Sequence, residues 1–394
     1  MNQRILDAME SCGINQAAII ETWKQMVEIE SYTHNPEGVY NICRYIKDKL
    51  EELGLKTTIC DFEGVGPSLI GTCGEGDIGE GIILAGHMDT VFKDGFALHN
   101  PFRIEKNLVF GPGVLDMKGG INLIFYILKV LKALDYNKPI KVIISGDEEH
   151  GHAKSRCGDF ITREAKGYKA AFNMETGLID NGIVTARKGM IFCTIKTKGL
   201  SAHAGNNFSE GISAIYEIAN KILEIQKLNE KYENTTFNVG LIHGGTMVNA
   251  VPEYAELKLD IRFVDDKIIE AVKTDLNKIA ASNRIEGATS ELVIENIFPA
   301  FGNQYNKEFY ELVKSISINN GLGEPKCVLL GGASDAAYIS KAGVPCLCGM
   351  GVKGKWNHTD REYAIIDSVM ERILLIVNSI LELENRELIS IGKN

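Results

Sequence analysis

Apolar residues recur along this chain in two patterns, one with helical spacing and one in short unbroken runs. Residues 16–53 show the helical spacing twice, which predicts two consecutive helices. Unbroken apolar runs follow at residues 81–85 and 140–145, with a helical segment at residues 122–134 between them. Short apolar strands that alternate with helices are typical of a sheet buried on both faces. The pattern therefore predicts an α/β domain built on a central, mostly parallel sheet.

A different order of elements runs from residue 190 to residue 301. Strand and helix patterns follow one another there as β-α-β-β-α-β, the order of a ferredoxin-like α+β unit. The expected strands are residues 191–197, 236–242, 254–263 and 291–297, and the expected helices are residues 209–226 and 266–280. The alternation of helices and short apolar strands seen in the first part of the chain then resumes, with helical patterns at residues 307–319 and 366–384. We therefore expect one domain from residues 1–189 and 302–394, with a second domain, residues 190–301, inserted into it.

The composition of the chain limits which classes of binding partner and which cellular location are expected. The 394 residues carry a formal net charge of −10, which argues against a nucleic-acid-binding surface. No apolar stretch reaches the length of a membrane span, and the first twenty residues lack a secretion signal, so we expect a cytoplasmic protein. The nine scattered cysteines fit reduced thiols, and Cys346 and Cys348 are expected to be buried strand residues, not a metal-binding pair.

Histidine and carboxylate residues gather in five short strings. Two of the strings, GHMDT and GDEEHG, begin where an apolar strand ends, and ligands collect at the carboxyl ends of strands in open α/β sheets. Imidazole nitrogen and carboxylate oxygen suit zinc or a neighbouring metal, and one shared carboxylate allows two ions to lie ~3.5–4 Å apart. The strings predict a two-metal hydrolase site from His87 and Asp89 in GHMDT, Asp116 in GPGVLDMKGG, Glu148 and Glu149 in GDEEHG, Glu175 in METG, and His358 in NHTD.

Each string taken alone has another explanation. A turn histidine or a solvated acidic run accounts for any single one. Glycines and Lys118 before a helix would suit a phosphate-binding loop, but the spacing matches neither common phosphate motif. Adjacent carboxylates would suit a glycosidase, which leaves His87 and His358 without a role. The same ligand chemistry in five strings favours the metal site.

The strings HMDTVF, NPFRIE, FGPGVLDMKGG, DEEHG, SAHAG, GGASDAAY and H-x-D occur here in that order. Together they resemble the metallopeptidase family of glutamate carboxypeptidase, acetylornithine deacetylase and succinyl-diaminopimelate desuccinylase, and most closely its glutamate carboxypeptidase branch. The resemblance covers nearly the whole chain and implies a zinc-peptidase-like catalytic domain with an inserted dimerisation or lid domain. It also implies these roles: His87 and Glu175 on one zinc, Glu149 and His358 on the other, Asp116 bridging, Glu148 as general base, and Asp89 orienting His87.

The resemblance carries further expectations. It implies a cis peptide between Asp116 and Met117. Relatives dimerise through the inserted domain and use the histidine that matches His203 to reach the partner's site, so we expect a homodimer in which His203 stabilises the oxyanion in trans. Action of His203 in cis, within its own subunit, is the alternative that the sequence leaves open.

The resemblance also bears on the substrate. It implies substrate contacts from Arg262, Asn249 and Gly332. Glutamate at position 175 favours a carboxypeptidase or deacylase over an aminopeptidase. We therefore expect hydrolysis of an N-acyl amino acid or small peptide with a free carboxylate, with an acidic or small polar residue at that end, by two divalent ions. Zinc is the expected metal, and cobalt or manganese would suit the same donors. Peptidase and deacylase stay open, and the alternative is a catalytically inactive binding protein on the same fold.

Overall fold

The computed structural model describes residues 3–153, 155–302, 304–386 and 388 and divides the chain into two compact units. The first unit consists of Met1–Ala186, Phe301–Leu330 and Ser334–Asn394. The second consists of Arg187–Ala300 and Gly331–Ala333, so its sequence interrupts that of the first. None of the described helices is both long enough and apolar enough to cross a membrane.

The first unit is built on a six-stranded sheet in the order β1-β2-β6-β3-β7-β14. The four strands from β6 to β14 run parallel, and β2 and β1 add an antiparallel edge, so the sheet is mostly parallel as predicted. Every residue of β3 is buried, which explains its unbroken apolar run. The strand bounds are β1 Lys56–Cys60, β2 Ser68–Cys73, β3 Ile82–His87, β6 Ile140–Ser145, β7 Ala170–Asn173 and β14 Cys346–Leu347.

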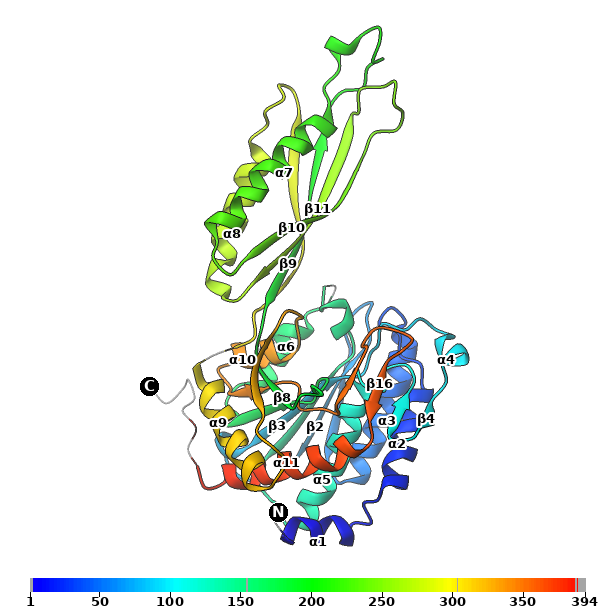
Figure 1. Ribbon diagram of the computed structural model, residues 1–394, viewed down its shortest axis with the longest axis vertical. Coiled ribbons are helices and arrows are strands. Elements are labelled where there is room, and N and C mark those ends of the chain that lie inside the picture. The colour runs from blue at the N-terminus through cyan, green and yellow to red at the C-terminus, as the bar shows by residue number, and fades with distance from the viewer. Residues whose placement is uncertain (1–2, 154, 303, 387, 389–394) are drawn as a thin grey trace. The chain divides into compact units, whose positions relative to one another are not determined.

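Helices cover this sheet, and Figure 1 shows α5 and α11 side by side. The two helices predicted first are α2 and α3. Each begins at an asparagine whose side chain accepts a backbone N–H of the first turn, Asn15 for α2 and Asn35 for α3. The bounds are α1 Gln3–Ser11, α2 Gln16–Glu28, α3 Pro36–Glu52, α4 Phe96–His99, α5 Lys118–Ala133, α6 Cys157–Ala165, α9 Gln304–Asn319, α10 Ala336–Lys341 and α11 Asp367–Leu383.

Two smaller sheets complete the strands of the first unit. One has the order β15-β16-β5-β4, and the loop between β15 and β16 carries His358. The other pairs β13 with β8, a strand that ends at Arg187 in the second unit. All nine cysteines are free, and Cys346 and Cys348 are buried as predicted. The bounds are β4 Arg103–Glu105, β5 Leu108–Phe110, β8 Gly182–Arg187, β13 Lys326–Leu330, β15 Gly354–Lys355 and β16 Tyr363–Ile365.

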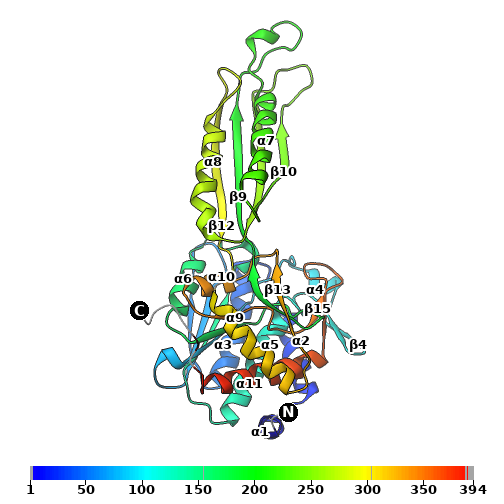
Figure 2. The ribbon, with the colours of Figure 1, turned by 60° about the vertical axis from the view of Figure 1, so that its left-hand side comes forward.

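The second unit has the predicted β-α-β-β-α-β order. Its antiparallel sheet has the order β10-β11-β9-β12, and Figure 2 shows α7 and α8 lying along it. Both helices begin later than predicted, because short 3-10 turns at Phe208–Glu210 and Asp266–Ile268 precede them and Ser213 caps α7. The bounds are β9 Gly189–Lys198, α7 Ala214–Lys231, β10 Thr236–Gly244, β11 Tyr254–Phe263, α8 Ile269–Ala281 and β12 Thr289–Phe298.

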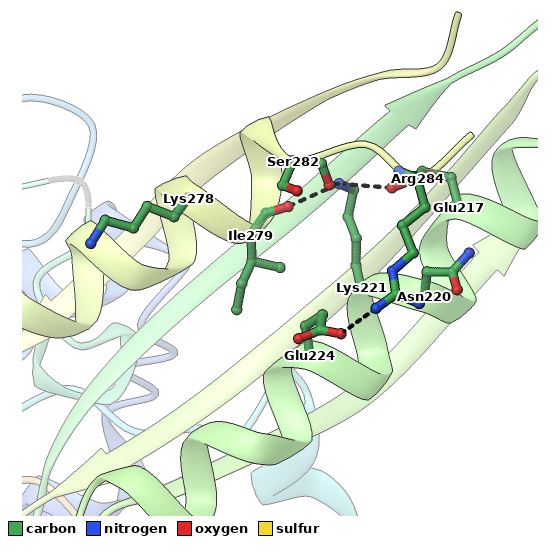
Figure 3. Close-up of a pocket in the computed structure, with 8 residues that line it drawn as sticks. All are labelled: Glu217, Asn220, Lys221, Glu224, Lys278, Ile279, Ser282 and Arg284. Atoms are coloured by element: carbon green, nitrogen blue, oxygen red, sulfur yellow. Dashed lines mark hydrogen bonds and ion pairs between the residues drawn. The ribbon is translucent and has the colours of Figure 1, made fainter. Parts of the chain in front are cut away.

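A buried ion pair joins α7 to the end of α8 in this unit. The Lys221 ammonium donates to the backbone carbonyls of Ile279 at 2.9 Å and Ser282 at 3.2 Å (Figure 3). It also donates to the carbonyl of Ala280 at 3.1 Å. The last carbonyls of a helix lack partners within the helix, so this cation serves as their cap. Glu217 lies 3.1 Å from the same ammonium and accepts two backbone N–H groups just beyond α8.

Candidate metal centre

The carboxyl ends of three neighbouring parallel strands meet at one edge of the central sheet. His87 ends β3 opposite Ser145 at the end of β6, and Asn173 ends β7. The segments that follow these strands carry Asp89, the Glu148–Glu149 turn and Glu175. Asp116 lies just before α5, and His358 comes from the β15–β16 loop. The structure thus brings residues from all five strings to one place.

Asp116 lies between the two imidazoles. Its Oδ1 is 3.2 Å from His87 Nε2, and its Oδ2 is 3.2 Å from His358 Nε2. Each oxygen of one carboxylate therefore faces a different ring nitrogen. This is the arrangement that a carboxylate shared by two metal ions requires.

The remaining carboxylates surround the same two nitrogens. Glu175 Oε1 lies 3.7 Å and Glu148 Oε2 3.9 Å from His87 Nε2, while Glu149 Oε2 lies 3.1 Å from His358 Nε2. Among these side chains, two groups have ligand atoms within 4.8 Å of one another, and both include His87: one adds Glu148 and Glu175, the other Asp116 and Glu149. By distance alone, Glu148 therefore groups with the ligands.

The donor set fits divalent cations. Burial raises the pKa of Glu148 and raises that of Glu149 to about 7, with the Asp116 charge adding to the second effect. Burial opposes ionisation of Asp116 too, but hydrogen bonds from His358 and His87 hold its pKa well below the usual range. The buried Oε1 of Glu149 has no hydrogen-bond partner within the described ranges. Such crowding of buried carboxylates around two imidazoles is typical of a metal site.

Asp89 supports both the histidine and the acidic turn. Its Oδ1 lies 3.3 Å from His87 Nδ1, the nitrogen that points away from Asp116. The same carboxylate accepts the backbone N–H of Glu148 at 3.2 Å and that of Glu149 at 3.0 Å. A carboxylate on the second ring nitrogen fixes the tautomer and leaves Nε2 free as a ligand.

Two residues that the sequence analysis did not single out hold Asp116. Asn357 donates to Asp116 Oδ2 at 2.8 Å and to Thr176 Oγ1 at 2.7 Å. Buried Glu362 accepts the backbone N–H groups of Leu115 at 2.8 Å and of Asp116 at 3.2 Å. Both lie within four residues of His358, and this proximity is the only sequence signal for them. The Asp116–Met117 peptide is cis, as the resemblance implies.

His203 lies exposed in the second unit, in a turn that follows β9. Its Nδ1 accepts the backbone N–H groups of Gly205 and Asn206, each at 3.1 Å. Because Nδ1 is an acceptor, the proton of the neutral ring is on Nε2, which can donate outward. The Asn249 carbonyl accepts the neighbouring Ala204 N–H at 2.9 Å, so Asn249 and His203 lie on adjacent segments.

The charge of Arg262 is already paired within the second unit. Its Nε donates to Asp260 Oδ1 at 2.7 Å and its Nη2 to Asp260 Oδ2 at 3.1 Å, and the guanidinium lies over the Phe192 ring. Arg187, which the sequence analysis did not consider, is buried and donates to the Gly332 carbonyl at 3.3 Å. Arg187, and not only the predicted contact residues, therefore holds the segment with Gly332.

The comparisons with known proteins agree with this arrangement. A family profile described as "Peptidase dimerisation domain" matches residues 185–288. Carboxypeptidase G2 of Pseudomonas sp. (strain RS-16) is 29% identical over 378 residues, which cover 93% of this chain and 90% of that protein. Acetylornithine deacetylase of Pasteurella multocida (strain Pm70) is 26% identical over 341 residues, which cover 78% and 82%.

The chain is a homologue of the M20 metallopeptidases and deacetylases. It is accordingly an enzyme of the metal-dependent hydrolase class. Solved M20-type structures share its fold. Aminopeptidase PepT from Bacillus cereus ATCC 10987 has a TM-score of 0.77 at 24% identity, with 95% of this chain and 100% of that chain covered. A Bacillus subtilis protein described as a dinuclear metal binding peptidase from the M20 family has a TM-score of 0.67 at 17% identity, with 94% and 99% covered.

Proposed function

We propose that this enzyme hydrolyses an amide or peptide bond in a small substrate with a free carboxylate, either an N-acyl amino acid or a short peptide. The observation that carries the proposal is that the two carboxylate oxygens of Asp116 face two different imidazoles, those of His87 and His358. The names of the relatives, a carboxypeptidase and a deacetylase, support this substrate class. No observation favours a binding-only role, since Glu148 and every expected ligand are present.

Two divalent ions, with zinc as the first candidate, would be held by His87 and Glu175 on one side and Glu149 and His358 on the other. Asp116 would bridge them. The dinuclear M20 peptidase of Bacillus subtilis supports the count of two. Bound ions would lower the pKa of a water towards neutrality and polarise the carbonyl of the substrate.

Glu148 is proposed as the general base. Burial raises the pKa of the Glu148 carboxyl, and a raised pKa makes its carboxylate a stronger proton acceptor, as this role requires. Glu148 takes the proton of the attacking water and then delivers it to the leaving amine nitrogen. Asp89 holds the His87 ring, and its hydrogen bonds to the turn hold Glu148.

The second unit is proposed to form a homodimer. It matches a peptidase dimerisation domain, and β10 is the edge strand of its sheet, with one side that pairs with no other strand in the part of the chain that the structure describes. The second unit also exposes large apolar side chains, and such side chains mark an interaction surface when they gather. The exposed residues are Tyr216 and Leu223 on α7, Leu241 and Ile242 on β10, and Met247 and Val248 in the next turn. In this proposal the His203 Nε2–H donates to the oxyanion in the partner's site.

The substrate class is tested with the zinc-loaded protein and a panel of N-acyl amino acids and dipeptides, each paired with its C-terminal amide. We expect turnover of the free carboxylates and a large rise in KM for the amides, because a carboxylate-binding site loses its charged partner. Equal turnover of acids and amides would contradict the carboxylate requirement. Full activity in excess chelator would contradict the metal requirement.

The role of His203 is tested by mixing subunits. In a heterodimer of Glu148→Gln with His203→Ala, action in trans gathers both defects into one site and leaves the other intact. Activity should then return to about half that of the wild-type dimer. A mixed dimer that forms but remains inactive would instead show action within one subunit.

A further inference from the structure

A second buried cluster of polar side chains adjoins the Glu148–Glu149 turn. At its centre is His152, with Nδ1 2.7 Å from Asp147 Oδ1 and Nε2 2.6 Å from Asp335 Oδ1. The outer oxygens are also bonded: Ser155 donates to Asp147 Oδ2 and Ser145 to Asp335 Oδ2, each at 2.5 Å. His152, Asp147 and Asp335 are all buried. No role in the proposed reaction accounts for this set.

The cluster differs from the metal centre in its distances. Asp147, His152 and Cys157 have ligand atoms close enough to hold an ion. However, both His152 nitrogens already lie at direct hydrogen-bond distance from carboxylates, and Cys157 Sγ lies 3.1 Å from Ser68 Oγ. In the metal centre the corresponding nitrogen–oxygen distances are 3.1 to 3.9 Å. The second cluster is therefore a closed hydrogen-bond network.

The two carboxylates favour the protonated ring. Each His152 nitrogen lies at hydrogen-bond distance from a carboxylate oxygen, and although burial lowers the pKa of His152, the Asp335 charge and the hydrogen bonds to Asp147 and Asp335 raise it well above its usual value. We therefore assign both nitrogens as donors. The network is an imidazolium between two buried carboxylates. Such an ion triad is stable only when complete, because removal of one member leaves a buried charge without a partner.

The network reaches the catalytic turn through the backbone. Asp147 directly precedes Glu148, and its carbonyl accepts the His152 N–H at 3.2 Å. The Gly151 N–H bonds to the Glu148 carbonyl at 2.6 Å, while Asp89 holds the Glu148 and Glu149 amides. The turn is thus fixed from two sides, by Asp89 and by the network.

We propose that His152 is a positioning residue that, through Asp147 and Asp335, holds the turn presenting Glu148 to the attacking water. Asp335 directly precedes α10 and lies 183 residues from His152, so the network ties the turn to a distant element of the first unit. The inference rests on the proposed role of Glu148 as general base. A small displacement of a catalytic group is costly, with about 1 Å sufficient for a ~10²-fold loss of rate.

The test is His152→Gln, assayed at saturating zinc. Glutamine is neutral, so it leaves two buried carboxylates without a cation. We expect kcat to fall about 10- to 100-fold with KM unchanged, because the turn shifts while the substrate contacts remain. Adding Asp335→Asn removes one of the two charges and should restore part of kcat. His99→Gln, at an exposed histidine of α4, is the matched control and should leave kcat unchanged.

Two measurements keep the test decisive. If His152→Gln does not fold, Ser155→Ala removes one hydrogen bond to Asp147 without exposing a charge and should lower kcat several-fold in a folded protein. Hydrogen exchange of the amides of residues 148–151 does not depend on catalysis and should be faster in either variant. Wild-type kcat and exchange in a folded variant would overturn the inference. If the wild-type protein hydrolyses nothing, the proposed function fails, and exchange alone still decides whether the network holds the turn.

Discussion

Replacing Glu148 with glutamine separates the two roles that its position allows, ligand and general base. Its Oε2 lies 3.9 Å from His87 Nε2 and belongs to a group that could hold an ion with Glu175. Glutamine has nearly the same volume and keeps one carbonyl oxygen. It carries no charge and cannot accept the proton of water.

The magnitude follows from what the substitution leaves in place. The imidazoles of His87 and His358 and the carboxylates of Asp116, Glu149 and Glu175 remain, so bound metal and KM should not change. General-base catalysis contributes ~10²–10⁴ in rate, which corresponds to about 2.7–5.4 kcal/mol of transition-state stabilisation. We expect kcat to fall by that factor.

The assay compares kcat, KM and metal content of Glu148→Gln with those of the wild type on one substrate from the panel. Glu105→Gln, at an exposed glutamate of β4, controls for the loss of a carboxylate and should match the wild type. A kcat within tenfold of wild type would refute the general-base assignment. Loss of one metal equivalent would make Glu148 a ligand, as its distance to His87 also allows.

Three further outcomes are expected. Asp116→Ala should lose both metal ions in elemental analysis, because each of its oxygens faces a different imidazole; retention of either ion contradicts a bridging role. Lys221→Met should lower the free energy of unfolding by about 3–5 kcal/mol in urea titration, because buried Glu217 loses its partner, whereas Lys227→Met at an exposed ion pair should change it by less than ~0.5 kcal/mol. Burial raises the pKa of Cys43 to about 12, so this thiol should stay protonated and resist alkylation at pH 8 until the protein unfolds; labelling of the native protein there contradicts the burial.

The sequence predicted the central sheet because burial leaves a plain pattern. β3 and β6 are short strands enclosed on both sides, so almost every position is apolar. α1 was not predicted, because a nine-residue helix buries only Ile5, Ala8 and Met9, and its contacts with α5 are tertiary. The starts of α7 and α8 were predicted too early, because a 3-10 turn and the helix that follows it share similar spacing.

The candidate site was predictable to the extent that its residues directly follow buried strands. Asp89, Glu148 and Glu175 stand in such places. Asn357 and Glu362 do not follow a buried strand. In a loop, the sequence does not distinguish an asparagine or glutamate that holds Asp116 from one that only faces solvent. Which carboxylate faces which imidazole depends on distances that no spacing rule contains, so the separate roles of Glu148 and Glu149 remain a proposal for experiment.

His150 and His152 mark the limit of sequence reasoning in this protein. They stand two residues apart in DEEHGHAKS, and nothing in the string distinguishes them. In the fold, the His150 and His34 rings pack edge to face with their centroids 4.7 Å apart, while His152 lies buried between two carboxylates. The second carboxylate comes from Asp335, so a contact across 183 residues decides which histidine lies between two carboxylates. Such a contact arises from the packing of α10 against α6, and only the folded chain contains it.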